Sequence, residues 1–191
     1  MADQYGMDPA RIERLRSPER LEYFDPDRIW DTLDPAPRST LVDIGVGVGF
    51  VSLPFARRYP ESKVIGCDIL EGMVALLRDA VQEEGLVNLE VAHMEPGMLP
   101  LPDASADIVV MAQVHHEVDE PAPLLAACKR ILKPSGIIVI VDWKDEDNGK
   151  SPPVGRRVPE ARLRAELTEA EFSDIAHHDI YEFHTFLSAS A

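Results

Sequence analysis

The chain has 191 residues, of which 45% are apolar and 28% charged, a balance typical of a soluble globular domain with its own core. Its 19 basic and 34 acidic side chains give a net charge of −15, which disfavours nucleic acid and anionic membranes as partners. No apolar run approaches the roughly 20 residues of a membrane span, and the start MADQYGMDPARIER lacks the apolar region of a signal peptide. We therefore expect a cytoplasmic location.

The cysteines and the basic clusters indicate which kinds of site the chain lacks. Cys67 and Cys128 lie far apart in apolar segments, a spacing that predicts neither a disulfide framework nor a metal site. Two basic clusters, Arg11 to Arg20 and Arg156-Arg157, are interleaved with acids or prolines, so we interpret both as solvated faces. We expect no metal, and a chain that is a monomer or a homodimer.

The predicted elements begin with a helical cap, residues 1–38, in which Arg11–Leu33 has the pattern of one or two polar helices. Residues 39–143 then alternate short apolar runs with helical patterns. The runs are mostly β-branched and bounded by Gly, Pro or Asp, as buried parallel strands are. They are Leu41–Ile44, Val64–Cys67, Leu89–Ala92, Ile108–Ala112 and Ile137–Val141.

Helical spacing appears between these runs. Met73 to Val81 has apolar residues at i, i+3, i+4, i+7 and i+8 and ends at Gly85, and Leu124 to Leu132 repeats the spacing before Lys133-Pro-Ser-Gly136. A helix beginning at about Phe50 follows the first strand. This alternation predicts a doubly wound α/β sheet with helices on both faces.

The C-terminal part, residues 144–191, starts with a polar, proline-rich connection, Lys144–Pro159. A helix over Glu160–Glu171 is followed by two strand-like segments, Ser173–Ile180 and Tyr181–Ser188. The short connection between these two segments permits an antiparallel pair but no crossover helix. We therefore predict a single domain, residues 1–191, with a mostly parallel seven-stranded Rossmann-like sheet that ends in an antiparallel strand.

The stretch Leu41–Phe50, LVDIGVGVGF, carries three glycines at alternate positions directly after a strand. Glycines at Gly45, Gly47 and Gly49 indicate that a ligand approaches the main chain, at the sheet edge where open α/β sheets bind ligands. The dinucleotide fingerprint G-x-G-x-x-G would need a glycine where Phe50 stands, which counts against an NAD-dependent oxidoreductase.

Two carboxylates accompany the loop. Asp43 ends the first strand, where it disfavours a diphosphate and favours a cation or a hydrogen-bond donor. Asp68 follows Gly49 by 19 residues, close to where a carboxylate takes ribose hydroxyls in dinucleotide folds. Loop and carboxylates together suit a nucleoside with a positive centre, such as S-adenosylmethionine.

Four segments in order resemble the motifs of class I S-adenosylmethionine-dependent methyltransferases. They are Leu41–Phe50, Gly66–Met73, Leu99–Val110, and Arg130–Gly136 with the strand over Ile137–Trp143. The similarity is strong over Leu41–Val141, and within the family it is greatest to the small proteins related to the ubiquinone/menaquinone-biosynthesis methyltransferases. The family's sheet also finishes with an antiparallel strand.

The resemblance implies roles for individual residues. Gly45, Gly47 and Gly49 would lie along the methionine part and sugar edge of the cofactor, Asp43 would hold its amino group, Asp68 its ribose hydroxyls, and Ile69 would lie against the adenine. The adenine-binding turn would be His93–Met98, with Glu95 in the place of the usual Asp, Pro96 without an N–H to offer, and Gly97 or Met98 as main-chain donor. Gln113 completes the predicted cofactor contacts.

The candidate catalytic cluster is Gln113-Val-His-His-Glu117, just past the fourth strand. His115 or His116 would accept a proton if the acceptor were a phenol, enol, amine or thiol. The alternative is that both histidines shape the turn structurally. His177, His178 and His184, on the late strands, are interpreted as surface or edge residues.

The leading hypothesis is methyl transfer from S-adenosylmethionine to a small-molecule acceptor. One alternative is a cofactor-binding protein of the same fold without this activity, which Pro96 favours. The other alternative is the NAD-dependent oxidoreductase, against which both Phe50 and the antiparallel end of the sheet count.

Overall fold

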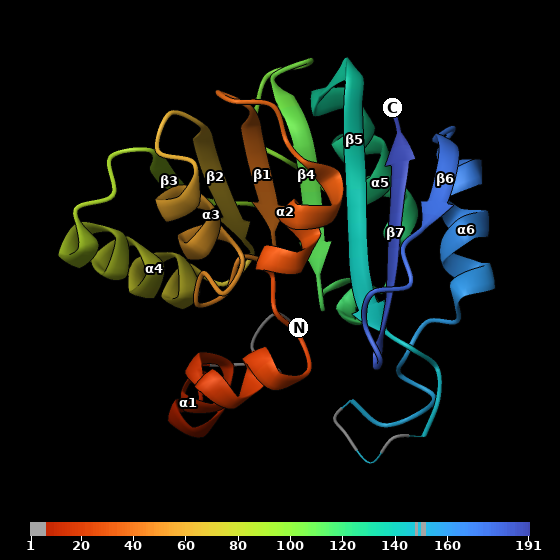
Figure 1. Ribbon diagram of the computed structural model, residues 1–191, viewed down its shortest axis with the longest axis horizontal. Coiled ribbons are helices and arrows are strands. Elements are labelled where there is room, and N and C mark those ends of the chain that lie inside the picture. The colour runs from red at the N-terminus through yellow and green to blue at the C-terminus, as the bar shows by residue number, and fades with distance from the viewer. Residues whose placement is uncertain (1–6, 148, 150–151) are drawn as a thin grey trace.

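The computed structural model describes residues 7–147, 149 and 152–191, so the first six residues of the predicted cap lie outside the described residues. Its centre is a seven-stranded sheet in the order β3-β2-β1-β4-β5-β7-β6 (Figure 1). Neighbouring strands from β3 to β5 are parallel, and β7 runs antiparallel to both β5 and β6. The predicted sheet, including its antiparallel C-terminal strand, is confirmed.

The strands and helices alternate along the chain as the apolar patterns predict. The strands are β1 (Thr40–Ile44), β2 (Lys63–Asp68), β3 (Leu89–His93), β4 (Ala106–Ala112), β5 (Leu132–Trp143), β6 (Ser173–His177) and β7 (His184–Ser190). The helices that connect them are α3 (Ser52–Arg58), α4 (Glu71–Glu84), α5 (Pro121–Ile131) and α6 (Glu160–Glu169), with a short 3₁₀ turn, η3 (His115–Glu117), after β4.

Each face of the sheet is covered by its own apolar core. On one face, α5 and α6 pack side chains such as Leu125 and Leu163 against Val42 and Ile138 of the strands. On the other face, α2 (Asp27–Leu33) and α3 pack Trp30 and Phe55 onto the sheet, with the two rings 4.6 Å apart edge to face. Alternate residues of β1 point into opposite cores, as the two-residue period of a strand requires.

The predicted N-terminal cap contains α1 (Pro9–Arg16), the 3₁₀ turn η2 (Pro18–Glu22) and α2. Asp8 caps α1 by accepting from the Ala10 N–H at 3.1 Å, and Pro9 occupies the first turn, where a missing N–H costs little. Figure 1 shows α1 beyond the carboxyl ends of the parallel strands, at the same edge as the chain that follows β5. The cap therefore adjoins the ligand-binding edge of the sheet.

The predicted boundaries of the last two strands are wrong. β6 ends at His177 and β7 begins at His184, because Tyr181 leaves the strand path and is buried in the core beside Phe24, with ring centroids 5.3 Å apart. Aromatic residues in a connection look like strand residues in the sequence, since both are apolar. In β5, Lys133–Gly136 lies within the strand as an irregular stretch, where the register with β4 shifts between Ala106 and Ile108.

No helix in the described part of the chain is long and apolar enough to cross a membrane.

The Tyr181 hydroxyl ties the connection between β6 and β7 to the cap, donating to the main-chain oxygen of Asp25 at 2.6 Å. We expect Tyr181→Phe to lower the free energy of unfolding by roughly 1 kcal/mol, since it leaves a partly buried acceptor without its donor. For a domain of this size that corresponds to a Tm lower by about 2–4 °C. Tyr59→Phe is the matched control, because the Tyr59 hydroxyl makes no hydrogen bond among the described residues. Equal Tm changes in the two variants would show that the bond to Asp25 contributes nothing.

Candidate cofactor and acceptor site

The order of the strands creates a switch point between β1 and β4. From β1 the chain winds outward to β2 and β3, and then returns to β4 on the other side of β1. The loops that leave β1 and β4 therefore diverge at this edge, which is where open α/β sheets bind ligands. The glycine loop follows β1, and the Gln113–Glu117 segment follows β4, so the structure brings the two predicted parts of the site together.

The three glycines of the loop answer two different needs. A Cβ on Gly45 would lie 2.5 Å from a methyl carbon of Val114, and one on Gly49 would lie 2.6 Å from Leu77, so close packing excludes side chains at both. A Cβ on Gly47 would meet nothing nearer than 3.9 Å, although its φ of +51° still favours glycine. Of the three, Gly47 leaves the main chain open to a ligand.

Asp43 is a buried carboxyl group without a cation among its described partners. It is 3% exposed, and it accepts a hydrogen bond of 2.5 Å from the hydroxyl of Ser52 at the start of α3. Burial raises the pKa of Asp43 to about 7, with a smaller contribution from the nearby charge of Asp68 and an opposing one from Ser52. A ligand ammonium group would supply the missing positive charge.

Asp68 fastens the glycine loop to the start of α4. One carboxylate oxygen accepts from the Gly47 N–H at 2.8 Å and the other from the Leu70 N–H at 2.9 Å. Burial raises the pKa of Asp68, while these main-chain bonds and the charge of Arg11 oppose the rise. A carboxylate has about four acceptor positions, so capacity for further donors such as ribose hydroxyls remains on both oxygens.

The predicted adenine turn is a tight turn built by Pro96 and Gly97. The Met98 N–H donates to the Glu95 oxygen at 2.9 Å, and Gly97 has a φ of +72°. Pro followed by a positive-φ Gly is the signature of a type II turn, which gives Pro96 a structural reason. Because the Met98 N–H is used within the turn, the Gly97 N–H is the main-chain donor that remains for a ligand.

Apolar side chains stand exposed beside this turn. Ile69 is 40% exposed and Met98 67% exposed. The loops that carry them are joined by the Met94 N–H to the Asp68 oxygen, 2.9 Å, and by a contact of 3.1 Å between His93 Nε2 and the Ile69 oxygen. Exposed apolar groups of this size suit a flat aromatic ligand such as adenine.

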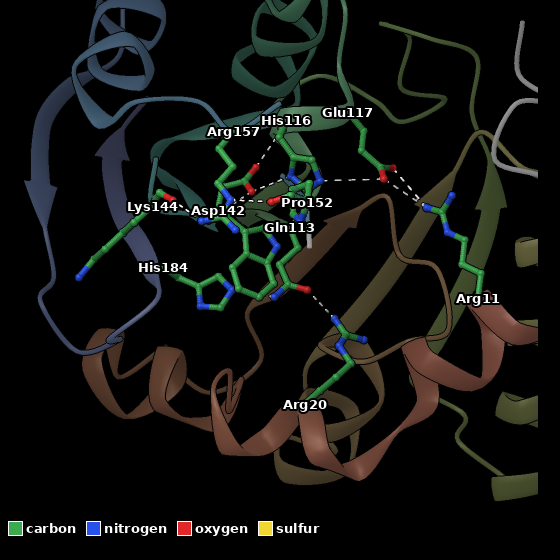
Figure 2. Close-up of polar contacts among 11 residues, drawn as sticks. Arg11, Arg20, Gln113, His116, Glu117, Asp142, Lys144, Pro152, Arg157 and His184 are labelled. Carbon is green, nitrogen blue, oxygen red and sulfur yellow. Dashed lines mark hydrogen bonds and ion pairs between the residues drawn. The ribbon is translucent and has the colours of Figure 1, made fainter. Parts of the chain in front are cut away.

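Gln113 links the cap to the end of the sheet. Arg20 donates to its Oε1 at 2.7 Å, and its Nε2 lies 2.8 Å from His184 Nε2 (Figure 2). Because a guanidinium only donates, the amide oxygen must face Arg20, and the amide N–H then donates to His184. Burial lowers the pKa of His184 to about 3, which agrees with a neutral ring that accepts at Nε2.

The surface interpretation of His184 is wrong. This residue is 1% exposed, and its ring lies 4.2 Å from the Trp143 ring. The solvated-face interpretation of the basic clusters is also wrong for Arg20 and Arg157, which are both buried. Arg157 donates to the main-chain oxygens of Pro152, Lys144 and Glu146 and so organises the chain after β5.

His116 forms a pair with a buried carboxylate. Its Nδ1 lies 2.7 Å from Asp142 Oδ1, its main-chain N–H donates to Asp142 Oδ2 at 2.9 Å, and the Trp143 N–H adds a third bond of 2.8 Å (Figure 2). A carboxylate only accepts, so Nδ1 carries the proton and Nε2 presents a lone pair. Asp142 lies near the end of the strand predicted over Ile137–Trp143, and nothing in the sequence indicates its pairing with His116.

His115 faces the other way. Its Nε2 lies 2.6 Å from Glu166 Oε2 on α6, and its side chain is 2% exposed. This contact fixes the turn after β4 against α6. The geometry thus separates the two predicted catalytic residues, with His115 bound to a helix and His116 held at the end of the sheet.

A cleft of about 320 Å³ is lined by both His115 and His116. Its walls come from the turn after β4, the start of α5, the chain that precedes α6, and the first turn of α6. They include Glu117, Asp119, Arg156 and Arg162, so most of the surface offered to an occupant is polar. In the described residues, no group of three or more His, Cys, Asp and Glu side chains could hold a metal ion.

A doubly wound sheet with a glycine loop and two buried carboxyl groups at its switch point defines a protein that binds a nucleoside-type cofactor. Residues 42–140 match the model of the family described as methyltransferase domain. The chain belongs to this family, the S-adenosylmethionine-dependent methyltransferases, and within it to the group like the ubiquinone/menaquinone-biosynthesis enzymes. The resemblance drawn from the four sequence motifs is confirmed.

Individual relatives show how far the likeness extends. A ubiquinone/menaquinone biosynthesis C-methyltransferase of Geobacter sulfurreducens is 34% identical over 133 residues, which are 65% of this chain and 51% of the relative. The nocamycin O-methyltransferase of Saccharothrix syringae is 32% identical over 67% of this chain and 47% of the relative. The chain thus spans about half the length of these curated relatives. The crystal structure of a SAM-dependent methyltransferase from Aquifex aeolicus has a TM-score of 0.89 and 32% identity, over 96% of this chain and 98% of that one.

The raised pKa of Asp43 predicts a pH-dependent effect on stability. Between its ordinary value of 3.8 and about 7, the folded state holds a proton that the unfolded state has lost, so ionising Asp43 costs stability as the pH rises through this window. Asp43→Asn removes that cost. We expect the Tm of the variant, taken relative to the wild type, to increase by at least about 2 °C between pH 5 and pH 8.

Scanning calorimetry at several pH values measures this difference, with Asp79→Asn on the exposed side of α4 as the control. A difference in Tm that stayed constant from pH 5 to pH 8 would contradict the assignment of the titration to Asp43.

Proposed function

We propose that this protein transfers a methyl group from S-adenosylmethionine to a small polar acceptor whose reacting atom lies beside His116. The observation that carries the proposal is the juxtaposition at one switch point of two parts. One is the glycine loop flanked by Asp43 and Asp68, and the other is the His116–Asp142 pair. The first part suits the cofactor, and the second suits removal of a proton from an acceptor.

The polar groups at the switch point fit the cofactor. Asp43 offers a buried carboxyl group for an ammonium, Asp68 offers acceptors for ribose hydroxyls, and Gly47 leaves room for contact with the main chain. Ile69 and the Glu95–Met98 turn would hold the adenine between apolar side chains and the Gly97 N–H. When bound, the cofactor supplies a methyl group on a sulfonium, which is already a good leaving group.

The protein's own contribution to the chemistry is positioning and proton removal. His116 Nε2 presents the lone pair that would accept the proton of an acceptor hydroxyl, amine or thiol as the new bond to carbon forms. Asp142 acts through His116 as a positioning residue, because it fixes the tautomer and orients the ring. Glu117 Oε1, 4.0 Å from Nε2, would favour the protonated imidazole that results.

The cleft beside His116 supports a small polar acceptor. A volume of about 320 Å³ matches the lower end of small-molecule sites, and charged side chains in its walls disfavour a long apolar chain. One relative is a ubiquinone/menaquinone biosynthesis C-methyltransferase and another a nocamycin O-methyltransferase, so the family itself leaves the acceptor open. We expect the acceptor atom to be a heteroatom that loses a proton.

Product analysis separates this proposal from a cofactor-binding protein without the activity. The protein is incubated with S-adenosylmethionine labelled in its methyl group and a panel of small phenols, carboxylic acids, amines and thiols. Transfer of label to a member of the panel supports the proposal. Tight binding of S-adenosylhomocysteine without transfer to any acceptor favours the alternative. A cytoplasmic location and a monomer or homodimer remain part of the proposal.

Asp68→Ala tests the ribose contact. We expect it to weaken S-adenosylhomocysteine binding by roughly 10–100-fold, the range for hydrogen bonds to a charged group. Because Asp68 also fastens the glycine loop, the variant will lose thermal stability as well. A ligand with a 2′-deoxyribose separates the two effects in calorimetry. The wild type should bind it more weakly than the parent ligand, and Asp68→Ala should bind both equally. A preference for the parent ligand that survives in the variant would refute the ribose contact.

His116→Gln tests the proton acceptor. Once an acceptor is found, we expect kcat to fall by about 10²–10⁴-fold at neutral pH, and the decrease of kcat on the acid side to disappear. Affinity for S-adenosylhomocysteine should be unchanged, and His177→Gln, on the edge strand β6, is the control for loss of an imidazole. If His116 only shapes the cleft, the KM for the acceptor rises while kcat and its pH profile keep their wild-type form.

A further inference from the structure

Arg20 is a buried cation that packs against Phe50, the residue directly after the glycine loop. It belongs to η2 in the cap, and its guanidinium carbon lies 3.8 Å from the centre of the Phe50 ring, which directly follows the loop. Figure 2 shows its side chain reaching from the cap toward Gln113 at the end of β4. Arg20 thus touches both halves of the switch point while remaining only 7% exposed.

The polar partners of Arg20 in the described residues are neutral groups. Its guanidinium donates to the main-chain oxygen of Leu15 and the amide oxygen of Gln113, each at 2.7 Å, and Tyr23 provides a further polar contact. Burial lowers the pKa of Arg20 to about 10, with Tyr23 opposing the shift. A buried guanidinium without a carboxylate is costly, because it gives up hydration and gains no opposite charge.

A second uncompensated charge lies on the other flank of the loop. Asp43 is buried against Ser52 with no cation among its described partners, and the charge of Asp68 adds repulsion. The glycine loop is therefore bounded by one buried site that needs a positive partner and one that needs a negative partner. An α-amino acid supplies both partners, because its ammonium nitrogen and its carboxylate carbon are bonded to the same carbon.

We propose that Arg20 binds the carboxylate of the methionine end of the cofactor, so that this end is held between Arg20 and Asp43. The inference rests on the proposed cofactor site and deepens it, since it assigns the carboxylate contact to the cap. Arg11, the other cap arginine at this edge, already pairs with Glu117 at 3.3 Å. Arg20 differs because the described residues give it no such acid.

A carboxylate bound to Arg20 would also hold the cap segment in place. Arg20 is carried by the segment that covers the glycine loop, so a ligand carboxylate would tie this segment to the loop. Ligands with the carboxylate should then protect the main-chain amides of residues 18–24 from hydrogen exchange. Ligands without it should leave that segment as it is in the free protein.

The test compares two ligands that differ only in the carboxylate. S-Adenosylhomocysteine carries it, and S-adenosyl-3-thiopropylamine keeps the adenosine, the thioether and the amine but lacks it. By calorimetry, we expect the wild type to bind the first about 10–100-fold more tightly, the effect of a charged hydrogen-bonded pair. Arg20→Met should remove this preference by weakening only S-adenosylhomocysteine, and Arg20→Lys should restore part of it.

Arg28→Met, an exposed cap arginine stacked on Tyr181, is the matched control and should leave both affinities unchanged. Equal weakening of both ligands by Arg20→Met would show that Arg20 only shapes the cap, and an undiminished preference would place the carboxylate elsewhere. If Arg20→Met does not fold, hydrogen exchange on the wild type decides, since equal protection of residues 18–24 by both ligands overturns the proposal. Failure of the wild type to bind either ligand would instead refute the cofactor site itself.

Discussion

The burial of the Asp43 carboxyl group at the carboxyl edge of β1 is the constraint on which the site depends. Its strand is central in the sheet, so water is excluded, and the Ser52 hydroxyl is a weak replacement for hydration. Asp68, at the end of the neighbouring strand, adds a second negative charge. The free protein therefore carries a local electrostatic cost that a positively charged ligand group relieves, a pattern expected where function opposes stability.

Two arginines of the cap, Arg11 and Arg20, lie at this acidic edge of the sheet. Burial raises the pKa of Asp68 and the charge of Arg11 opposes that rise; Arg11 also pairs with Glu117, while Arg20 lies over Phe50. In a chain with a net charge of −15, the cap thus gathers positive charge where two buried acids lie. The Arg11–Glu117 ion pair joins the cap to the turn after β4, and the apolar contacts of Trp30 and Phe24 fix the base of the cap on the sheet. The cap thus both covers the cofactor edge and brings positive charge close to its buried acids.

The parts that the sequence predicted are those that depend on local patterns. The apolar runs gave every parallel strand, because a buried strand needs apolar residues whatever lies around it. The glycine loop and Asp68 were predictable because a main-chain shape and a strand end fix them. The burial of Arg20 was not, since its partner Gln113 is 93 residues away and only tertiary packing brings the two together. His184 and Arg157 were misread for the same reason, and Tyr181 because an apolar connection has the composition of a strand.

The sequence does not distinguish the adjacent histidines His115 and His116, but the turn after β4 gives their side chains different partners. Consecutive side chains of a 3₁₀ turn point about 120° apart, so His115 and His116 cannot face the same neighbour. His115 meets Glu166 on α6, so its side chain ties the turn to that helix. His116 meets Asp142, which ends a central strand and so presents the ring at the ligand edge. Both side chains border the cleft, and under the proposed function the bond to Asp142 leaves His116 Nε2 for the acceptor, while His115 ties the turn to α6.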